Sequence, residues 1–246
     1  MGIRFVDLEG AKAASGLRLV LAVNVPSPWS EAVRALVAAK KLDAVAVPLT
    51  LTDVEVRRWS GVPNAPAVLW ESELARSGWA EILSLLERLT PGHVPAEQRV
   101  ELFGLSHELM GERGLAWCRR ALLVAQGIAT EGREGLPLQA SRALVTRYGH
   151  ATGEVSWARE RSVSLLREFD RRLDGKEFFY RHLSALDVYC AAVVNSLEPL
   201  PQEARSLAPQ ARAIFSWADP AVAAAITAEL RAHRDRLAPL FRIEGV

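Results

Sequence analysis

This sequence has few cysteines, a net charge close to zero and no long hydrophobic run, and each of these features excludes some classes of function. The 246 residues include only two cysteines, Cys118 and Cys190, whose separation along the chain suits neither a metal site nor a redox pair. The net charge is +1, so no overall field attracts nucleic acid or an anionic membrane. The apolar run over residues 17–25 is too short to span a bilayer and lacks the cleavage site of a signal segment. We therefore expect a soluble protein of the reducing cytoplasm that holds no metal and binds a small molecule or a protein.

Hydrophobic residues, by contrast, make up 50% of the sequence, which suits one large domain or two smaller ones. Strand patterns occur only in its first third. Leu17–Val23 is a nearly continuous apolar run, typical of a strand that is buried on both faces. Ala44–Val47 predicts a second strand, with a helix between the two. Residues 52–59 predict a short helix, for which Thr52 and Asp53 are the capping candidates.

The stretch 64–89 predicts a hairpin that runs directly into a helix. Ala67–Trp70 is apolar, a polar turn follows at Glu71–Glu73, and Leu74 and Ala75 are expected to form the second strand. The apolar residues of the next segment recur at helical spacing along one face: Trp79, Ile82, Leu83, Leu86 and Leu89. Ser77 stands at the start of this helix, where a hydroxyl and unpaired backbone N–H groups favour an anion.

Residues 90–96 contain two prolines and a glycine, which is typical of a linker between domains. Beyond the linker no strand signal occurs, so residues 97–246 are expected to be all-helical. Helices are expected over residues 97–126, 138–150, 154–173, 184–198 and 203–234, with the first weakened at Gly111 and Gly114 and the last interrupted near Asp219 and Pro220. At the other end of the chain, Ile3, Phe5 and Leu8 are expected in an edge strand, and Gly10 to Gly16 in a loop of small residues.

Ser184 and Asp187 have the spacing of a capping box, in which the serine and the acidic residue three positions later cap a helix together. The residues that follow, 186–197, are apolar on most sides, as expected of a buried helix.

The order of elements, Pro66 at the start of a strand, and the Ser184–Asp187 box far downstream together resemble the glutathione transferase superfamily. The resemblance covers nearly all of the chain after residue 16, and it implies an α/β part followed by an all-α part. The first is a thioredoxin-like domain of order βαβαββα over residues 17–89, and the second is a helical bundle over 97–246, joined by the linker 90–96. Residues 1–16 are a departure, because the family's first strand usually starts nearer the N-terminus, and we assign them no function.

The resemblance also implies an enzyme that is a homodimer and acts in detoxification. Such an enzyme conjugates the thiolate of its co-substrate, glutathione, to a hydrophobic electrophile. In the family, the proline is cis, the backbone before it pairs with the cysteinyl unit of glutathione, and a serine holds the γ-glutamyl carboxylate. The matching residues are Ala65, Pro66 and Ser77. Arg76 departs from the family, because many relatives have an acidic residue or glutamine there for the glutamyl amine, and Asn64 replaces a common lysine. Since Arg76 attracts a carboxylate instead, we expect an altered glutathione pose or another anion.

The loop from Ser27 to Ser30 occupies the position of the Cys-x-x-Cys pair in thioredoxin-like proteins. Hydroxyls replace both sulfurs, which excludes disulfide exchange at this site. The resemblance implies a serine-type transferase, in which Ser27 activates the glutathione sulfur. Ser30 is the reserve candidate, although one turn into the helix its hydroxyl is expected to point away from the strand end. Alternatively, Ser27 is only the N-cap of a helix that begins at Pro28.

Five residues match the position of the family's second-substrate pocket: Trp29, His107, Met110, Arg113 and Trp117. An apolar pocket with a few polar groups suits a hydrophobic electrophile, although each of these residues alone is more often a packing residue. The other histidines have no spacing for a metal or a catalytic triad and are expected at the surface or in the linker: His93, His150, His182 and His233.

Two alternatives stay open at this point. Arg76 and Asn64 favour a non-catalytic binding or scaffold protein of the same fold. The resemblance also allows another glutathione-dependent reaction, such as isomerisation, dehalogenation or ether cleavage.

Overall fold

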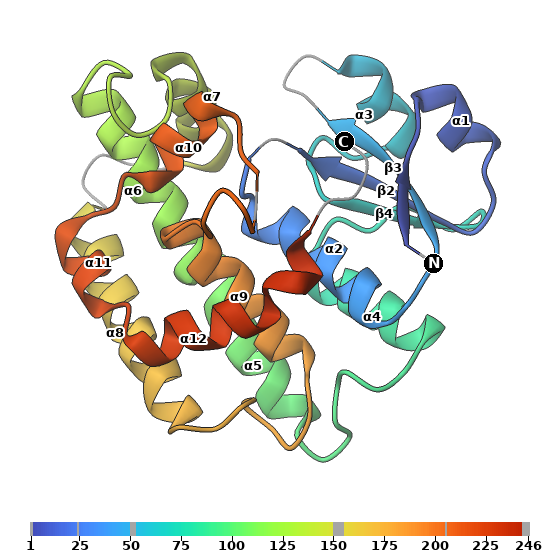
Figure 1. Ribbon diagram of the computed structural model, residues 1–246. Helices are drawn as coiled ribbons and strands as arrows, with labels where there is room; N and C mark the ends of the chain where they lie inside the picture. Colours follow the sequence, from blue (N-terminus) through green and yellow to red (C-terminus); the bar gives the residue numbers. More distant parts are fainter. Residues whose placement is uncertain (1, 24, 50–52, 150–154, 205, 243–246) are drawn as a thin grey trace.

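The computed structural model describes residues 2–23, 25–49, 53–149, 155–204 and 206–242. A sheet with its own helices lies on one side of the molecule, and helices alone form the other side (Figure 1). Every strand of the described ranges precedes residue 71, so an α/β part is followed by an all-α part, as the sequence predicts.

The sheet has four strands in the order β1-β3-β2-β4. They are β1 (Ile3–Phe5), β2 (Leu17–Ala22), β3 (Ala44–Leu49) and β4 (Ala67–Trp70). The strand β3 runs parallel to β1 and β2, whereas β4 runs antiparallel to β2. Because β2 lies inside the sheet, both of its faces are covered: Leu19 and Leu21 belong to the main core, and Val20 belongs to a smaller apolar cluster. This burial explains the continuous apolar run in β2.

Helices cover both faces of the sheet (Figure 1). On one face α2 (Pro28–Ala39) and α4 (Trp79–Leu89) contribute their buried residues to the main core. On the other face Ala11 of α1 (Leu8–Ala13) and Val56 of α3 (Val54–Ser60) join the smaller cluster. The expected thioredoxin-like arrangement is present, and the unit β1–α1 extends it beside β3.

The N-terminal extension is more regular than expected. The edge strand is confirmed at Ile3–Phe5, where Ile3 pairs with Ala44 of β3. The expectation that Leu8 lies in this strand is wrong, because Leu8 is the first residue of α1. The expected loop from Gly10 to Gly16 is wrong in its first part, because α1 continues to Ala13. The helix is capped by Asp7, whose carboxylate accepts the Gly10 N–H at 2.7 Å, and such a cap offsets the low helix propensity of the glycine.

The predicted hairpin is present in a reduced form. Instead of a strand at Leu74 and Ala75, a single antiparallel bridge joins Arg76 to Val68, with N···O distances of 2.8 and 2.9 Å. The polar turn is longer than expected. Within it, Glu71 adopts a positive φ and the Glu73 N–H donates to the Trp70 carbonyl. The Ala65–Pro66 peptide is cis, as the resemblance implies.

Eight α-helices and a 3₁₀ helix follow in the described part of the chain. They are α5 (Arg99–Met110), α6 (Leu115–Ala129), α7 (Leu138–Tyr148), α8 (Val155–Leu173), α9 (Ala185–Leu197), α10 (Pro209–Ser216), α11 (Pro220–Ala225), α12 (Ala228–Leu237) and the 3₁₀ helix Ala238–Phe241. The expected helix 97–126 is broken between Met110 and Leu115, around its two glycines. The expected helix 203–234 is three helices, with one break at Asp219 as predicted and another at Ile226. The proposed cap Thr52 and His150 lie outside the described residues.

The centre of the helical part is α9, in which every residue is buried. It packs against α2, α5 and α12 (Figure 1). One apolar core therefore runs from the sheet into the helical bundle. The division into residues 17–89, 90–96 and 97–246 stays a prediction, because this core is shared by both parts.

The start of α9 is fixed by the carboxylate of Asp187, which is completely buried. The predicted capping box forms, and the Ser184 N–H and hydroxyl both donate to Oδ2 of Asp187, at 2.8 and 2.6 Å. The other oxygen, Oδ1, accepts the Phe179 N–H at 2.9 Å and lies 3.0 Å from Nε2 of His233. The expectation that His233 lies at the surface is therefore wrong. Its side chain projects from α12, is buried, and pairs with this carboxylate.

A second polar contact joins distant parts of the chain. On α2, Arg34 is buried and donates to Glu31 at 2.7 Å and to the Phe241 carbonyl at 2.9 Å. The 3₁₀ helix that contains Phe241 is thereby held against α2, although 207 residues separate the two partners.

Removing parts of the Asp187 network should destabilise the protein by unequal amounts. Ser184→Ala should lower the free energy of unfolding by about 1 kcal/mol, the usual effect of losing an N-cap hydroxyl. Asp187→Ala should cost more, because each donor left without an acceptor costs about 1–3 kcal/mol. Urea unfolding followed by circular dichroism measures both changes. Equal stabilities of the two variants would show that the carboxylate does not organise this corner.

Candidate functional site

The predicted site lies where β2 ends and α2 begins. Ser27 is the N-cap residue of α2, and Pro28 occupies the first helical position, as the capping alternative requires. The hydroxyl of Ser27 nevertheless makes no capping hydrogen bond to the first turn, and the residue is only half-buried. Ser27 therefore has a hydroxyl beside unpaired helix N–H groups that the helix itself does not use.

Ser30 is oriented differently from our expectation. Its side chain is buried, and its hydroxyl oxygen accepts the N–H of Ala22 at 3.1 Å. The hydroxyl thus points toward the end of β2, because the first turn of α2 packs back against the strand it follows. The expected objection to Ser30 is therefore wrong, but its side chain is buried and its oxygen already accepts a backbone N–H, so Ser30 stays the reserve candidate.

The proline corner lies next to this loop. Ala67, the first residue of β4, is paired with Val20 near the end of β2. Because the two strands are antiparallel, Ala65 and Pro66 come to the same edge of the sheet as the loop that leads to Ser27. Two parts of the predicted glutathione site are therefore neighbours in the fold, although Ser27 and Ala65 lie 38 positions apart in the sequence.

The third part of the predicted site is less regular. The N-cap of α4 is Gly78, so Ser77 lies one residue before the cap and is exposed. Its neighbour Arg76 is paired with Glu73 at 2.6 Å, and Glu73 also accepts from Arg88 at 2.6 Å. The two guanidinium groups, Arg88 first and then Arg76, lower the pKa of the Glu73 carboxyl. Arg76 and Arg88 share this single carboxylate, so one positive charge of the pair is not neutralised by Glu73.

Three of the five residues expected in a second-substrate pocket are connected by contacts in the structure. The indole N–H of Trp29 donates to the Met110 carbonyl at 2.8 Å, which brings these two together. Trp117 joins them indirectly, because the guanidinium of Arg120 lies 5.0 Å from the Trp29 ring and 4.5 Å from the Trp117 ring.

The other two residues face different rings. His107 is exposed and lies beside Trp79, with ring centroids 6.2 Å apart. The guanidinium of Arg113 stacks 3.9 Å from the ring of Trp157 in α8.

Sequence reasoning missed Arg120, which lies among three aromatic rings. Besides Trp29 and Trp117, the Tyr148 ring is 4.0 Å from its guanidinium carbon. We call Arg120, Trp29, Trp117 and Tyr148 the Arg120 cluster. The available signal was the i, i+3 spacing of Trp117 and Arg120, which places both on one face of α6.

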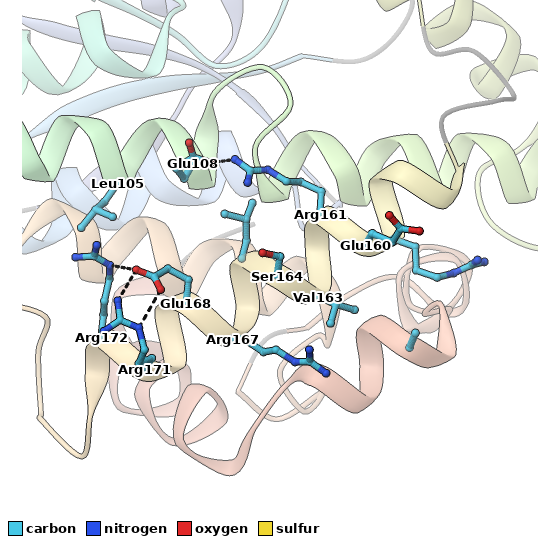
Figure 2. A pocket seen from close by; sticks show the side chains of 13 residues that line it. Leu105, Glu108, Glu160, Arg161, Val163, Ser164, Arg167, Glu168, Arg171 and Arg172 are labelled. Atoms are coloured by element: carbon cyan, nitrogen blue, oxygen red, sulfur yellow. Dashed lines mark hydrogen bonds and ion pairs between the residues drawn. The ribbon is translucent and has the colours of Figure 1, made fainter.

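A separate groove of about 840 Å³ runs between α5 and α8 (Figure 2). Several of its charged side chains pair with one another: Arg161 with Glu108, and both Arg171 and Arg172 with Glu168. The groove contains none of the predicted site residues. Within the described ranges, no helix is long and apolar enough to cross a membrane, and no cluster of three or more histidine, cysteine or acidic side chains could hold a metal ion.

No protein-family model and no curated protein is detectably similar to the sequence, but many solved structures share its fold. A glutathione S-transferase domain-containing protein from Marinobacter aquaeolei VT8 is 15% identical, with a TM-score of 0.63 over 92% of this chain and 100% of that one. The beta-etherase LigF from Sphingobium sp. strain SYK-6 is 14% identical, with a TM-score of 0.59 over 85% and 98%.

A third structure is that of a glutathione transferase from Pseudomonas putida with glutathione disulfide bound. It is 16% identical, with a TM-score of 0.56 over 91% of this chain and 99% of that one. At these identities the similarity shows the fold. The chain has the glutathione S-transferase fold, a thioredoxin-like part followed by a helical bundle, as the sequence predicts.

The contacts of the two serines predict unequal effects of their substitution on stability. Ser30→Ala should lower the free energy of unfolding by about 1 kcal/mol, because the Ala22 N–H loses its acceptor. Ser27→Ala should change it by less than about 0.5 kcal/mol, because the hydroxyl caps nothing. Thermal and urea unfolding of the two variants checks this. A larger loss for Ser27→Ala would mean that Ser27 is a structural cap.

Proposed function

We propose that this protein binds glutathione at the corner of Ser27, Ala65, Pro66, Arg76 and Ser77 and conjugates its thiolate to a hydrophobic electrophile. The observation that carries this proposal is the position of Ser27. It is the N-cap residue of the first helix after the central strand of a glutathione S-transferase fold, and its hydroxyl makes no cap bond. Solved proteins of the fold include one crystallised with glutathione disulfide, which supports the choice of ligand.

The chemistry needs a thiolate, because a thiol is a poor nucleophile at neutral pH. A hydroxyl that donates to the sulfur favours its anionic form, and the positive end of α2 acts in the same direction. Together they lower the pKa of the thiol from about 8.5 toward neutrality. The thiolate then forms a bond from sulfur to the electrophilic carbon, while a leaving group departs with its electron pair.

The second substrate would lie beside the first turn of α2, where Trp29, Met110 and Trp117 are gathered. His107 and Arg113, which face Trp79 and Trp157, would border this region from α5 and from the turn that follows it. The proposal includes a homodimer and a cytoplasmic role in detoxification, in line with the same resemblance.

Ether cleavage is the second candidate reaction. One of the similar structures is a beta-etherase, and the same thiolate would serve that reaction by displacing an alkoxide or phenoxide in place of a halide. A panel of aryl halides and aryl ethers, with product analysis by mass spectrometry, separates the two reactions.

The pH dependence of conjugation tests the role of Ser27. In wild type the apparent pKa of the rate should lie below that of free glutathione, and it should rise in Ser27→Ala because the thiolate loses a donor. Activity should fall without vanishing, since the N-terminus of α2 stays in place. Rate against pH with one model electrophile, together with the ultraviolet absorbance of bound thiolate, gives these values. A profile that shifts in Ser30→Ala but not in Ser27→Ala would move the catalytic role to Ser30.

Affinity for glutathione tests the part played by Arg76. If the family's pose of the glutamyl amine holds, Arg76→Gln should strengthen binding several-fold, because it removes a charge that repels the ammonium group and one of the two guanidinium partners of Glu73. The matched control is Arg88→Gln, which also removes a partner of Glu73 but does not adjoin Ser77. Calorimetry measures both variants. Tighter binding by wild type than by Arg76→Gln would show that Arg76 holds a carboxylate and that the ligand lies in another pose. Absence of binding by all three proteins would favour the scaffold alternative.

A further inference from the structure

A side chain of the first turn of α2 reaches the helical part of the chain. Trp29 is the second residue of α2, and its indole N–H donates to the Met110 carbonyl at 2.8 Å, across 81 positions of the sequence. Met110 is the last residue of α5, where a helix leaves carbonyl groups without a partner inside the helix. The indole therefore supplies a hydrogen bond that the end of α5 lacks.

The Met110 carbonyl is held in place by the tight turn that follows α5. The Gly111 N–H donates to the His107 carbonyl at 2.8 Å, and the Gly114 N–H donates to the Gly111 carbonyl at 3.1 Å. A Cβ atom at Gly111 would lie 2.7 Å from the His107 carbonyl oxygen. At Gly114 it would lie 2.7 Å from that of Glu108, so a side chain at either position would displace the backbone. The side chain of Met110 is itself buried. The acceptor of the indole bond is thus a fixed point of the helical bundle.

The donor side of the bond belongs to the turn that begins at Ser27. The Glu31 N–H donates to the Ser27 carbonyl at 2.8 Å and closes the first hydrogen-bonded turn of α2. Pro28, the next residue, has a fixed φ, which restricts the backbone of this turn further. Because the turn moves as a unit, a contact made by Trp29 also fixes the position of Ser27.

The first turn of α2 depends on such contacts because it lies outside the densest packing of the helix. The fully buried apolar residues that α2 contributes to the main core begin at Ala32, beyond the first turn. On the side of the sheet, the Ser30 hydroxyl accepts the Ala22 N–H. On the side of the helical bundle, Trp29 makes its bond to Met110. The Ser27 hydroxyl must lie within hydrogen-bond reach of the sulfur to act on it, so a small displacement of this turn weakens its effect.

We propose that Trp29 is a positioning residue for the thiolate. Its hydrogen bond to the Met110 carbonyl holds Ser27 at the distance from which the serine hydroxyl donates to the glutathione sulfur. This inference rests on the proposed function and gives the indole N–H of Trp29 a role apart from lining the second-substrate region. Trp29 acts through Ser27 and forms no bond to glutathione.

The test measures the pKa of the glutathione thiol in the binary complex, from the ultraviolet absorbance of bound thiolate against pH, without an electrophile. Trp29→Phe keeps an aromatic ring and removes the N–H donor. It should raise this pKa by about 0.5, the size expected when one hydrogen bond to the thiolate is weakened. The matched control Trp59→Phe changes a half-buried tryptophan on the other face of the sheet, and it should leave the thiol pKa as in wild type.

A double variant distinguishes positioning of Ser27 from an independent effect of Trp29. In Ser27→Ala/Trp29→Phe the thiol pKa should rise by less than the two single rises together, because residues that act through one another are not additive. In a wild type that lowers the thiol pKa, additive rises or an unchanged pKa in Trp29→Phe would overturn the proposal. Thermal unfolding shows whether each variant folds, and Trp29→Leu, which also lacks the donor, carries the comparison if Trp29→Phe does not.

Hydrogen exchange without ligand separates this inference from the proposed function. The Glu31 N–H should exchange faster in Trp29→Phe than in wild type or Trp59→Phe, because the first turn of α2 opens more often without its contact to α5. That result in a protein whose bound glutathione has the thiol pKa of free glutathione would refute the thiolate mechanism and support the contact as the one that holds Ser27. An exchange rate unchanged by Trp29→Phe would refute the positioning role, whatever the enzyme activity.

Discussion

The structure depends most on the buried carboxylate of Asp187. Its two oxygens receive donors from the loop before α9, from the N-cap residue Ser184 and from His233 in α12. A carboxylate removed from water is tolerated only when it is paired in this way. These contacts fix the first turn of α9, and α9 in turn packs against α2, whose N-terminus contains Ser27. The position of the candidate catalytic serine is therefore set partly by a carboxylate in the other half of the chain.

The sequence predicts the main elements well where the signal is local. The apolar run of β2, the capping box at the start of α9 and the helix break at Asp219 each depend on a few adjacent residues. All three are present in the structure. Expectations failed where a distant partner or a turn decided the outcome. A run of small residues favoured a loop, yet Asp7 caps α1 there, and the hairpin has only the bridge between Val68 and Arg76 beyond its turn. His233 shows no pattern of its own, since its partner Asp187 is 46 residues away.

The candidate site was predictable in part for the same reason. Ser27, Ala65 and Pro66 belong to a pattern that strands and turns impose, and the antiparallel pairing of β2 with β4 brings them together. Arg120 was not predictable, because its contact with Trp29 joins residues that lie 91 positions apart. The hydroxyl of Ser30 was misplaced for a different reason: the direction of one side chain depends on how the first turn of α2 packs against β2, which spacing alone does not give. The catalytic role of Ser27 stays a prediction.

The bond between Arg34 and the Phe241 carbonyl has a consequence for biosynthesis. Strands and helices of the first third can form while the ribosome still holds the remainder of the chain. The guanidinium of Arg34 receives this partner only after residue 241 has been synthesised, because the contact spans 207 positions. Until then α2 lacks one of the contacts that hold it in the complete fold. In the nascent chain, the helix that begins next to Ser27 therefore lacks this hydrogen bond. The order of translation thus delays completion of this corner until residue 241 has emerged.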